Sequence, residues 1–393
     1  MTVIDMTVQW SPGQWSLRLP RGFEFDGAVP PAIAVQPTGF LVGEAAAAAV
    51  HAGVARPVAG GPVAYAGCVV MLSNRRSLVR TAARLADVED WMGGEVAAVA
   101  AAVHDRLDRI SRKRPEFAGL GLDRARLIGV INVTPDSFSD GGDRLDPRTA
   151  IEAGIAMAEA GADLIDVGGE STRPGARPVS ADAECVRVIP VIEALTAHGV
   201  AVSVDTRRVA VMAAARQAGA RVVNDVRALG ERPGEIPGAL DYLAATGMPV
   251  IVMHMQGTPE TMQDNPRYTD APYEVFRFLD RRVEALHAAG HPDGAVAVDP
   301  GIGFGKDDTH NGAILGAIGL LHATGCPIVL GASRKSFIAR LSRGEPAKAR
   351  LPGSIAAVAA AALQGVQLFR VHDVAQTRQA LAVVASLGGT GVP

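Results

Sequence analysis

The stretch GADLIDVGG, residues 161–169, has a glycine in front of a short and mostly apolar run. Glycine ends a helix at little cost, because the left-handed conformation after the last turn suits a residue without Cβ. A continuous apolar run of about five residues is typical of a strand buried on both faces, as in a parallel sheet. This stretch therefore predicts the junction between a helix and a buried strand of an α/β fold.

The same pattern recurs from Arg126 onward. Ala-rich helical stretches end at glycines, which are Gly161, Gly199, Gly219, Gly247, Gly290, Gly325 and Gly365. With one further run in front of them, the apolar runs are 126–133, 163–169, 201–206, 221–226, 249–255, 295–301, 327–333 and 367–373. Eight strands that alternate with helices predict a closed (β/α)8 barrel, the TIM fold, over residues 124–393. An open doubly wound sheet is the alternative.

Residues 1–111 have a different pattern and predict a smaller α+β domain. Strand-like segments at 15–19, 32–35 and 63–72 alternate with many Gly and Pro residues, and a helix is expected over 88–110. Residues 112–123 are expected to form a linker, because basic residues and a proline end that helix. This region has no catalytic motif, so a packing or assembly role is favoured over a second activity.

The composition is typical of a globular protein with a large core. Of the 393 residues 48% are hydrophobic and 20% are charged, and the formal net charge is −3. These values favour a large core and argue against nucleic acid or a membrane surface as the main partner. The three cysteines are far apart and the N-terminus lacks a signal-peptide pattern, so a reducing, cytoplasmic location is expected.

Polar residues stand at the expected C-terminal ends of the strands, where TIM barrels have their active sites. The third, fourth and sixth strands end in Asp205, Asn224 and Asp299. Acceptors beside an amide suit the N–H edge of a flat nitrogen heterocycle. Buried charges are costly unless they are paired, so this gathering predicts a binding site and not a structural core.

A cationic group at the last two strands predicts a phosphate site. It consists of Arg334, Lys335, Arg370 and His372. Barrels often hold phosphate at this part of the rim. Asn132, at the end of the first strand, carries no charge and is expected to help place a Mg²⁺ ion that bridges phosphate oxygens.

Some residues at the strand ends have structural explanations. Asp205 and Asp225 each precede a helix and are also candidates for its N-cap. The segment 301–306 resembles a P-loop only faintly, because a proline stands where the first glycine belongs and Asp307 replaces the Ser or Thr. His254, between two methionines on an apolar strand, is expected to be a hydrogen-bonded core histidine and not a ligand.

Taken together, the strand ends resemble those of the dihydropteroate synthase family. The matching segments are NVTPDSFSDGG at 132–142, the second loop at 166–175, and shorter motifs at 205–206, 224–226, 299–306, 333–335 and 370–373. The resemblance covers residues 127–377 and keeps the order of the motifs. It implies a transferase of folate biosynthesis that joins p-aminobenzoate to 6-hydroxymethyl-7,8-dihydropterin diphosphate. The products would be 7,8-dihydropteroate and diphosphate.

The resemblance also implies a role for each matching residue. The residues expected to bind the pterin are Asp205, Asn224, Asp299, Lys335 and Met253. Those expected to hold the diphosphate, with Mg²⁺ at Asn132, are Asn132, Thr172, Arg173, Arg370 and His372. Those expected to border the p-aminobenzoate pocket are Ser333, Phe304 and Arg173. The catalytic set is Asp205, Lys335, Arg370, Asp299 and Asp136, of which Asp136 helps to order the site. A homodimer is also implied.

Two departures from the family and two alternative functions remain. Arg227, Ala228 and Leu229 stand where the family often has small residues, and Asp307 stands where threonine is common.

A methyltransferase that uses methyl-tetrahydrofolate on a related barrel would share the acids but would need no diphosphate site. The other alternative is a non-catalytic pterin-binding or assembly protein, whose working part would be the N-terminal region.

Overall fold

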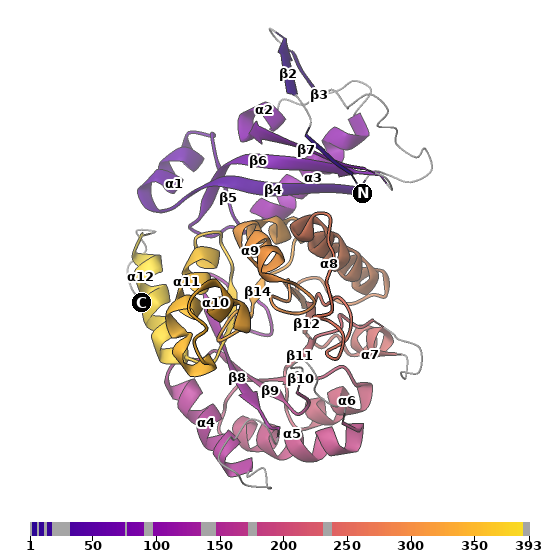
Figure 1. Ribbon diagram of the computed structural model, residues 1–393, viewed down its shortest axis with the longest axis vertical. Helices are drawn as coiled ribbons and strands as arrows, with labels where there is room; N and C mark the ends of the chain where they lie inside the picture. Colours follow the sequence, from indigo (N-terminus) through magenta and orange to yellow (C-terminus); the bar gives the residue numbers. More distant parts are fainter. Residues whose placement is uncertain are drawn as a thin grey trace.

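The structure is a computed structural model of the chain. It describes residues 2–5, 8–11, 14–17, 32–74, 77–89, 97–134, 147–171, 179–230 and 238–387. Within these ranges, every helix is too short or too polar to cross a bilayer. Figure 1 shows a smaller N-terminal unit above a larger unit of strands and helices.

The larger unit is a parallel barrel. Its eight strands pair in the order β13-β12-β11-β10-β9-β8-β15-β14. They are β8 (Arg126–Asn132), β9 (Leu164–Gly168), β10 (Val202–Asp205), β11 (Val222–Asp225), β12 (Val250–Met253), β13 (Val296–Asp299), β14 (Val329–Leu330) and β15 (Leu368–Val371). A parallel bridge between Val298 and Ile328 joins the two ends of this order and closes the barrel. Each strand lies inside one of the apolar runs, which confirms the predicted TIM barrel.

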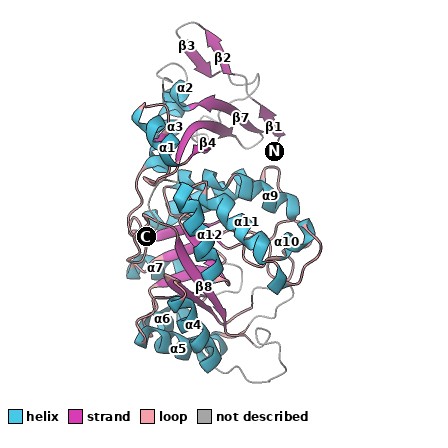
Figure 2. Ribbon diagram, turned by 90° about the vertical axis from the view of Figure 1, so that its left-hand side faces the viewer, coloured by secondary structure: helices cyan, strands magenta, loops and turns pink. Residues whose placement is uncertain are grey.

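Helices alternate with the strands and cover the outside of the barrel (Figure 2). They are α4 (Pro147–Glu159), α5 (Ala181–Ala197), α6 (Val209–Gln217), α7 (Ala239–Thr246), α8 (Ala271–Ala288), α9 (Asp308–Gly316), η2 (Ile318–Thr324), α10 (Ser336–Leu341), η3 (Ala347–Ala349), α11 (Leu351–Ala362) and α12 (Val374–Leu387). All seven glycines expected at helix ends have a positive φ, between 62° and 100°. The local chemistry of these junctions therefore agrees with the prediction.

One layer of apolar side chains fills the bottom of the barrel. The strands contribute Ile128, Leu164, Val222, Ile251, Ala297, Val329 and Leu368. Phe117 is fully buried in the same layer and closes the barrel at the N-terminal ends of the strands. Residues 112–123 are thus more than the expected linker, because their one aromatic side chain belongs to the barrel core.

The smaller unit is built on a sheet with the order β1-β7-β6-β4, and β5 also pairs with β6. Its strands are β1 (Thr2–Asp5), β4 (Ala32–Leu41), β5 (Arg56–Pro57), β6 (Ala64–Ser73) and β7 (Ser77–Arg84). The strands β2 (Val8–Ser11) and β3 (Gln14–Leu17) form a separate antiparallel pair. The helices are α1 (Gly43–His51), α2 (Leu85–Glu89) and α3 (Ala97–Ser111). The helix expected over 88–110 corresponds mainly to α3.

The two units meet through a buried ion pair. Arg106 of α3 donates to both carboxylate oxygens of Asp280 on α8, at 2.6 and 2.7 Å, and to Ala323 O of η2 at 2.9 Å. Phe40 of β4 packs against η2, where a Cβ on Gly319 would lie 2.7 Å from its ring. The N-terminal unit is therefore docked on α8 and η2 by side chains as well as joined to them by the chain.

Candidate active site

A buried carboxylate, Asp166 of β9, is the centre of the polar network at the C-terminal ends of the strands. It accepts hydrogen bonds from Ser203 Oγ at 2.6 Å, Asn224 Nδ2 at 3.0 Å and Arg370 Nε at 2.6 Å. Side chains from β9, β10, β11 and β15 thus converge on one group. The sequence pattern assigns no role to Asp166. Its position inside the apolar run LIDVG is the one sequence feature that indicates a role. A buried acid needs a cation or hydrogen-bond donors nearby.

Asp205 and Asn132 lie close together over Gly168. A Cβ on that glycine would be 3.5 Å from Asn132 Oδ1 and 3.7 Å from Asp205 Oδ2, which is ordinary van der Waals contact with both side chains. Asp205 accepts a hydrogen bond from Arg370 Nη2 at 2.8 Å. Burial raises the pKa of Asp205, and the guanidinium of Arg370 opposes that shift. The N-cap alternative for Asp205 is wrong, because Arg208 occupies the N-cap position of α6.

Asp299 of β13 also approaches Arg370. A Cβ on Gly331 would lie 3.6 Å from Asp299 Oδ2 and 3.9 Å from Arg370 Cβ. The other oxygen, Asp299 Oδ1, accepts a hydrogen bond from Gly301 N at 2.7 Å. Burial raises the pKa of Asp299, whereas the neighbouring Lys335 lowers it. Asp166, Asp205 and Asp299 are therefore grouped around one arginine.

Lys335 lies against the turn that follows β13. Its Nζ donates to Ile302 O and is 4.5 Å from the centroid of the Phe304 ring, which is a cation–π contact. Burial lowers the pKa of Lys335 to about 8, and Asp299 opposes the shift. Lys335 therefore loses its charge as the pH rises through about 8.

The predicted cationic group is smaller than the sequence suggests. Arg334 pairs with Asp373 at 2.5 and 2.9 Å, so its charge is neutralised within the protein. His372 remains near the rim, where its Nδ1 lies 3.1 Å from Ser333 Oγ. The same hydroxyl accepts a hydrogen bond from His372 N at 3.2 Å. Ser333 therefore positions His372 from the segment that follows β14.

Two of the ambiguous aspartates are structural. Asp225 accepts hydrogen bonds from two backbone N–H groups of the following turn, at 2.8 and 2.9 Å. Asp307 caps α9 in a capping box. In the turn after β11, Ala228 and Leu229 have φ values of 49° and 60°. Arg282 holds this left-handed turn by donating to both carbonyls, at 2.6 and 2.9 Å.

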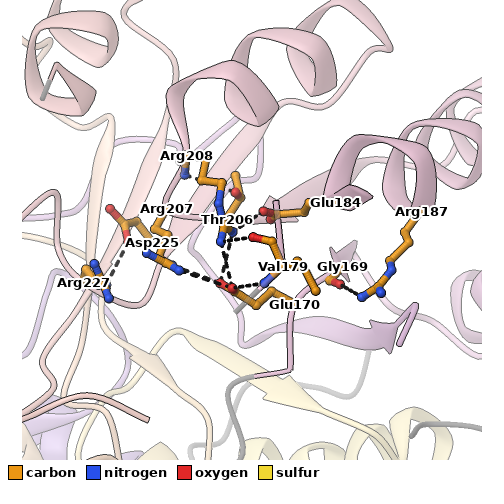
Figure 3. Close-up of polar contacts among 10 residues, drawn as sticks. All are labelled: Gly169, Glu170, Val179, Glu184, Arg187, Thr206, Arg207, Arg208, Asp225 and Arg227. Carbon is orange, nitrogen blue, oxygen red and sulfur yellow. Dashed lines mark hydrogen bonds and ion pairs between the residues drawn. The ribbon is translucent and has the colours of Figure 1, made fainter. Parts of the chain in front are cut away.

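A charged cluster beside the network fastens the ends of the second loop (Figure 3). Glu170 accepts hydrogen bonds from Arg207 Nε at 2.9 Å, Arg208 Nη2 at 2.8 Å and Val179 N at 3.1 Å. Arg208 also donates to the buried Glu184 and to Val179 O, both at 2.5 Å. Burial by itself would raise the pKa of Glu170, but Arg207 and Arg208 lower it to about 2. The cluster therefore joins residues on both sides of that loop.

Glu170→Gln is expected to lower the free energy of unfolding at neutral pH by roughly 3 kcal/mol, since one pKa unit corresponds to about 1.4 kcal/mol. The carboxylate pKa is lowered from 4.5 to about 2, so its contribution is complete above pH 4.5 and is lost as the pH falls toward 2. Urea unfolding of both proteins across that range measures the difference. Glu193→Gln, on an exposed position of α5, is the control. A difference that stays constant with pH would contradict the assignment.

Three predicted site residues, Asp136, Thr172 and Arg173, lie outside the described residues. His254 is buried and its Nδ1 lies 2.9 Å from Lys306 Nζ, in agreement with the expected core histidine. Met253 is also buried and is in register with Asp299 of the neighbouring strand.

Comparison with known proteins identifies relatives of the barrel. Residues 128–372 match the family described as pterin binding enzyme. The chain is 44% identical over 266 residues to dihydropteroate synthase of Escherichia coli (strain K12), a match that covers 67% of this chain and 92% of the relative. It is 43% identical over 273 residues to dihydropteroate synthase of Mycobacterium leprae (strain TN), with 68% and 95% covered.

Solved structures give the same result. The Yersinia pestis dihydropteroate synthase in a sulfonamide drug complex superposes with a TM-score of 0.65 and 44% identity, over 69% of this chain and 97% of that one. The Xanthomonas albilineans dihydropteroate synthase in complex with 7,8-dihydropteroate has a TM-score of 0.61 and 43% identity, over 68% and 95%. The residues before 128 lie outside the matched family region.

Proposed function

This chain belongs to the family of pterin-binding enzymes, and from that premise we infer that it is a dihydropteroate synthase. The reaction joins p-aminobenzoate to 6-hydroxymethyl-7,8-dihydropterin diphosphate and releases diphosphate. The observation that carries this function is the single network of Asp166, Asn224, Asp205 and Arg370. Relatives named dihydropteroate synthase favour this reaction over methyl transfer.

The acids of the network are assigned to the pterin ring. Oxygen atoms of Asp205, Asn224 and Asp299 are acceptors for the ring N–H and amino groups. Met253, in register with Asp299, would pack against the ring, and Lys335 would donate to its oxygen edge. All five side chains are at least partly buried, so substrate binding would displace little water. Each hydrogen bond to the ring would form at a low local dielectric constant, which strengthens it.

Arg370 and His372 are assigned to the diphosphate. The Nε and Nη2 atoms of Arg370 bond to Asp166 and Asp205. Within the described part of the chain, its Nη1 bonds to no other residue. A guanidinium held in this way by two carboxylates keeps a fixed orientation and presents its remaining edge to phosphate oxygens.

Asn132 is assigned to a Mg²⁺ ion that the diphosphate would bring. Among the described residues, no three His, Cys, Asp or Glu side chains are grouped to hold a metal by themselves. Magnesium is commonly held by one or two protein oxygens together with substrate phosphates and water. The single amide oxygen of Asn132, beside Asp205, fits that kind of site. The ion would supply neutralisation of the leaving diphosphate.

The protein groups then stabilise developing charge and need no covalent intermediate. Breaking the bond between the pterin methylene carbon and the diphosphate oxygen leaves positive charge that the ring delocalises. The carboxylates of Asp205 and Asp299 favour that charge, while Arg370 favours the negative charge on the diphosphate. The amine of p-aminobenzoate attacks the methylene carbon, a C–N bond replaces the broken C–O bond, and the resulting ammonium releases its proton to solvent. The substitution is therefore largely dissociative, and positioning is the main contribution of the enzyme.

Phe304 is the better supported of the two described residues assigned to the p-aminobenzoate pocket. Its half-buried ring lies beside Lys335, at the edge of the network. The Ser333 hydroxyl is already engaged by His372.

A homodimer is also proposed, and light scattering of the purified protein tests it. The free cysteines Cys68, Cys185 and Cys326 support a reducing, cytoplasmic location.

Diphosphate release tests the function directly. The purified chain is expected to release diphosphate from the pterin diphosphate when p-aminobenzoate and Mg²⁺ are present, and far less without p-aminobenzoate. The value of kcat/KM should fall above a pH of about 8, because the Lys335 amine loses its charge there. Release that does not depend on p-aminobenzoate would contradict the proposal.

A further inference from the structure

Lys306 is a fully buried lysine to which the reaction gives no role. Its Nζ lies 2.9 Å from His254 Nδ1 and donates to Phe304 O at 2.9 Å and, more weakly, to His254 O at 3.4 Å. Lysine is almost never fully buried unless it is partnered, because its amine is costly to remove from water. Three partner atoms, on one residue from each of two segments, show that this amine joins the end of β12 to the turn after β13.

The turn at 301–305 has a shape that only glycine permits. Gly301, Gly303 and Gly305 have φ values of 65°, 82° and 63°. A Cβ on Gly301 would collide with His254 O, and one on Gly305 would collide with Gln256 O. The turn therefore lies directly on the backbone that follows β12, and Lys306 fastens it there.

This turn carries groups of the proposed site. Ile302 O accepts a hydrogen bond from Lys335 Nζ, and the Phe304 ring lies 4.5 Å from the same nitrogen. The carbonyl that Lys306 holds belongs to Phe304. One amine thus holds the backbone of the residue whose ring faces Lys335. It also interacts electrostatically with Lys335 and Asp299, and it hydrogen-bonds to neither.

We propose that Lys306 is a positioning residue of the synthase, which places Phe304 and Lys335 by fastening the turn 301–305 to the end of β12. The part of this proposal that concerns p-aminobenzoate rests on the proposed function, because Phe304 is assigned to its pocket. The part that concerns Lys335 rests only on the contacts of the turn. The two parts are therefore tested by different measurements.

Lys306→Met keeps the apolar stem and removes the three amine contacts. The expected result is a rise in KM for p-aminobenzoate of at least about fivefold with a smaller change in kcat, because misplacement of a binding wall affects binding first. Leu107→Ala is the matched control. Leu107 is fully buried in α3, away from the strand ends, so this variant should lose stability but keep the native KM.

Lysine NMR provides the readout that does not need catalysis. The chain has four lysines, Lys113, Lys306, Lys335 and Lys348, so the Lys335 signal can be resolved and assigned with Lys335→Arg. Burial lowers the pKa of Lys335, while Asp299 raises it and Arg370 lowers it. Loosening the turn admits water, so the titration midpoint of Lys335 should move upward in Lys306→Met by about half a unit or more.

Tyr268→Phe is a second variant if Lys306→Met does not fold. It removes the hydroxyl that donates to Gly305 O at 2.8 Å on the outer side of the same turn, and it should change KM in the same direction by less. An unchanged midpoint for Lys335 would overturn the proposal whatever the activity. A moved midpoint without diphosphate release from the native enzyme would keep the positioning role and reject the proposed function.

Discussion

Replacing Arg370 with alanine is expected to lower kcat/KM by more than about a hundredfold, or roughly 2.7 kcal/mol of transition-state stabilisation. Arg370 donates to Asp166 at 2.6 Å and to Asp205 at 2.8 Å. The variant would lose the cation proposed for the leaving diphosphate and would leave two carboxylates without their partner. Steady-state diphosphate release over a range of pterin diphosphate concentrations measures the loss.

The same change should also weaken the fold. Asp166 is fully buried, and removing one member of a buried ion pair commonly costs about 3–5 kcal/mol, because the other charge remains without compensation. Arg340→Met is the control: Arg340 is a more exposed arginine of α10 that pairs with Asp308 at 2.7 Å. It should change kcat/KM by less than about threefold, as expected for an exposed pair. Native kinetics in Arg370→Ala would remove this residue from the site.

Arg106→Met is expected to lower the free energy of unfolding by roughly 3–5 kcal/mol. Asp280 is 1% exposed, and Arg106 supplies two of its hydrogen bonds, at 2.6 and 2.7 Å. The remaining partner, Arg277, is 3.4 Å away and cannot replace a bidentate contact. Urea unfolding monitored by circular dichroism measures the loss.

Two further variants separate charge from packing at this contact. Arg106→Met combined with Asp280→Leu should recover much of the stability, because no unpaired charge is then buried. Arg109→Met, on the same helix, removes an exposed pair with Asp105 at 2.8 Å and should cost less than about 1 kcal/mol. If Arg106→Met and Arg109→Met were equally stable, docking of the N-terminal unit would not depend on the buried pair. Removal of residues 1–111 also removes Arg106, so it is not a neutral truncation.

Much of the barrel is predictable because the sequence features that specify its strands and helix ends involve only neighbouring residues. A glycine such as Gly161, with a φ of 99°, ends a helix by its own conformational freedom, and the run after it forms β9. The location of the strand ends is predictable as well. All strands of a parallel barrel point in one direction, so their C-terminal ends lie on one face. For this reason the sequence alone predicts Asp205, Asn224 and Asp299 on one face of the barrel.

The partners within that face were not predictable. Asp166 and Arg370 are 204 residues apart in the chain, and Arg106 and Asp280 are 174 apart. No local pattern links such residues. The sequence alone therefore assigns no role to Asp166 and groups Arg334 with the phosphate site, although Asp373 neutralises it. Phe117 was placed in a linker for the same reason, because its burial depends on a space that eight separate strands enclose.

In the barrel, the sequence by itself therefore determined which segments become strands, where the helices end and which chemical groups reach the mouth. Each of these depends on neighbouring residues only. The tertiary structure alone decided which acid pairs with which base, that Lys306 is buried against His254, and that the N-terminal unit is held by Arg106. The physical reason is that an ion pair or a buried amine depends on distances that exist only after the barrel has closed.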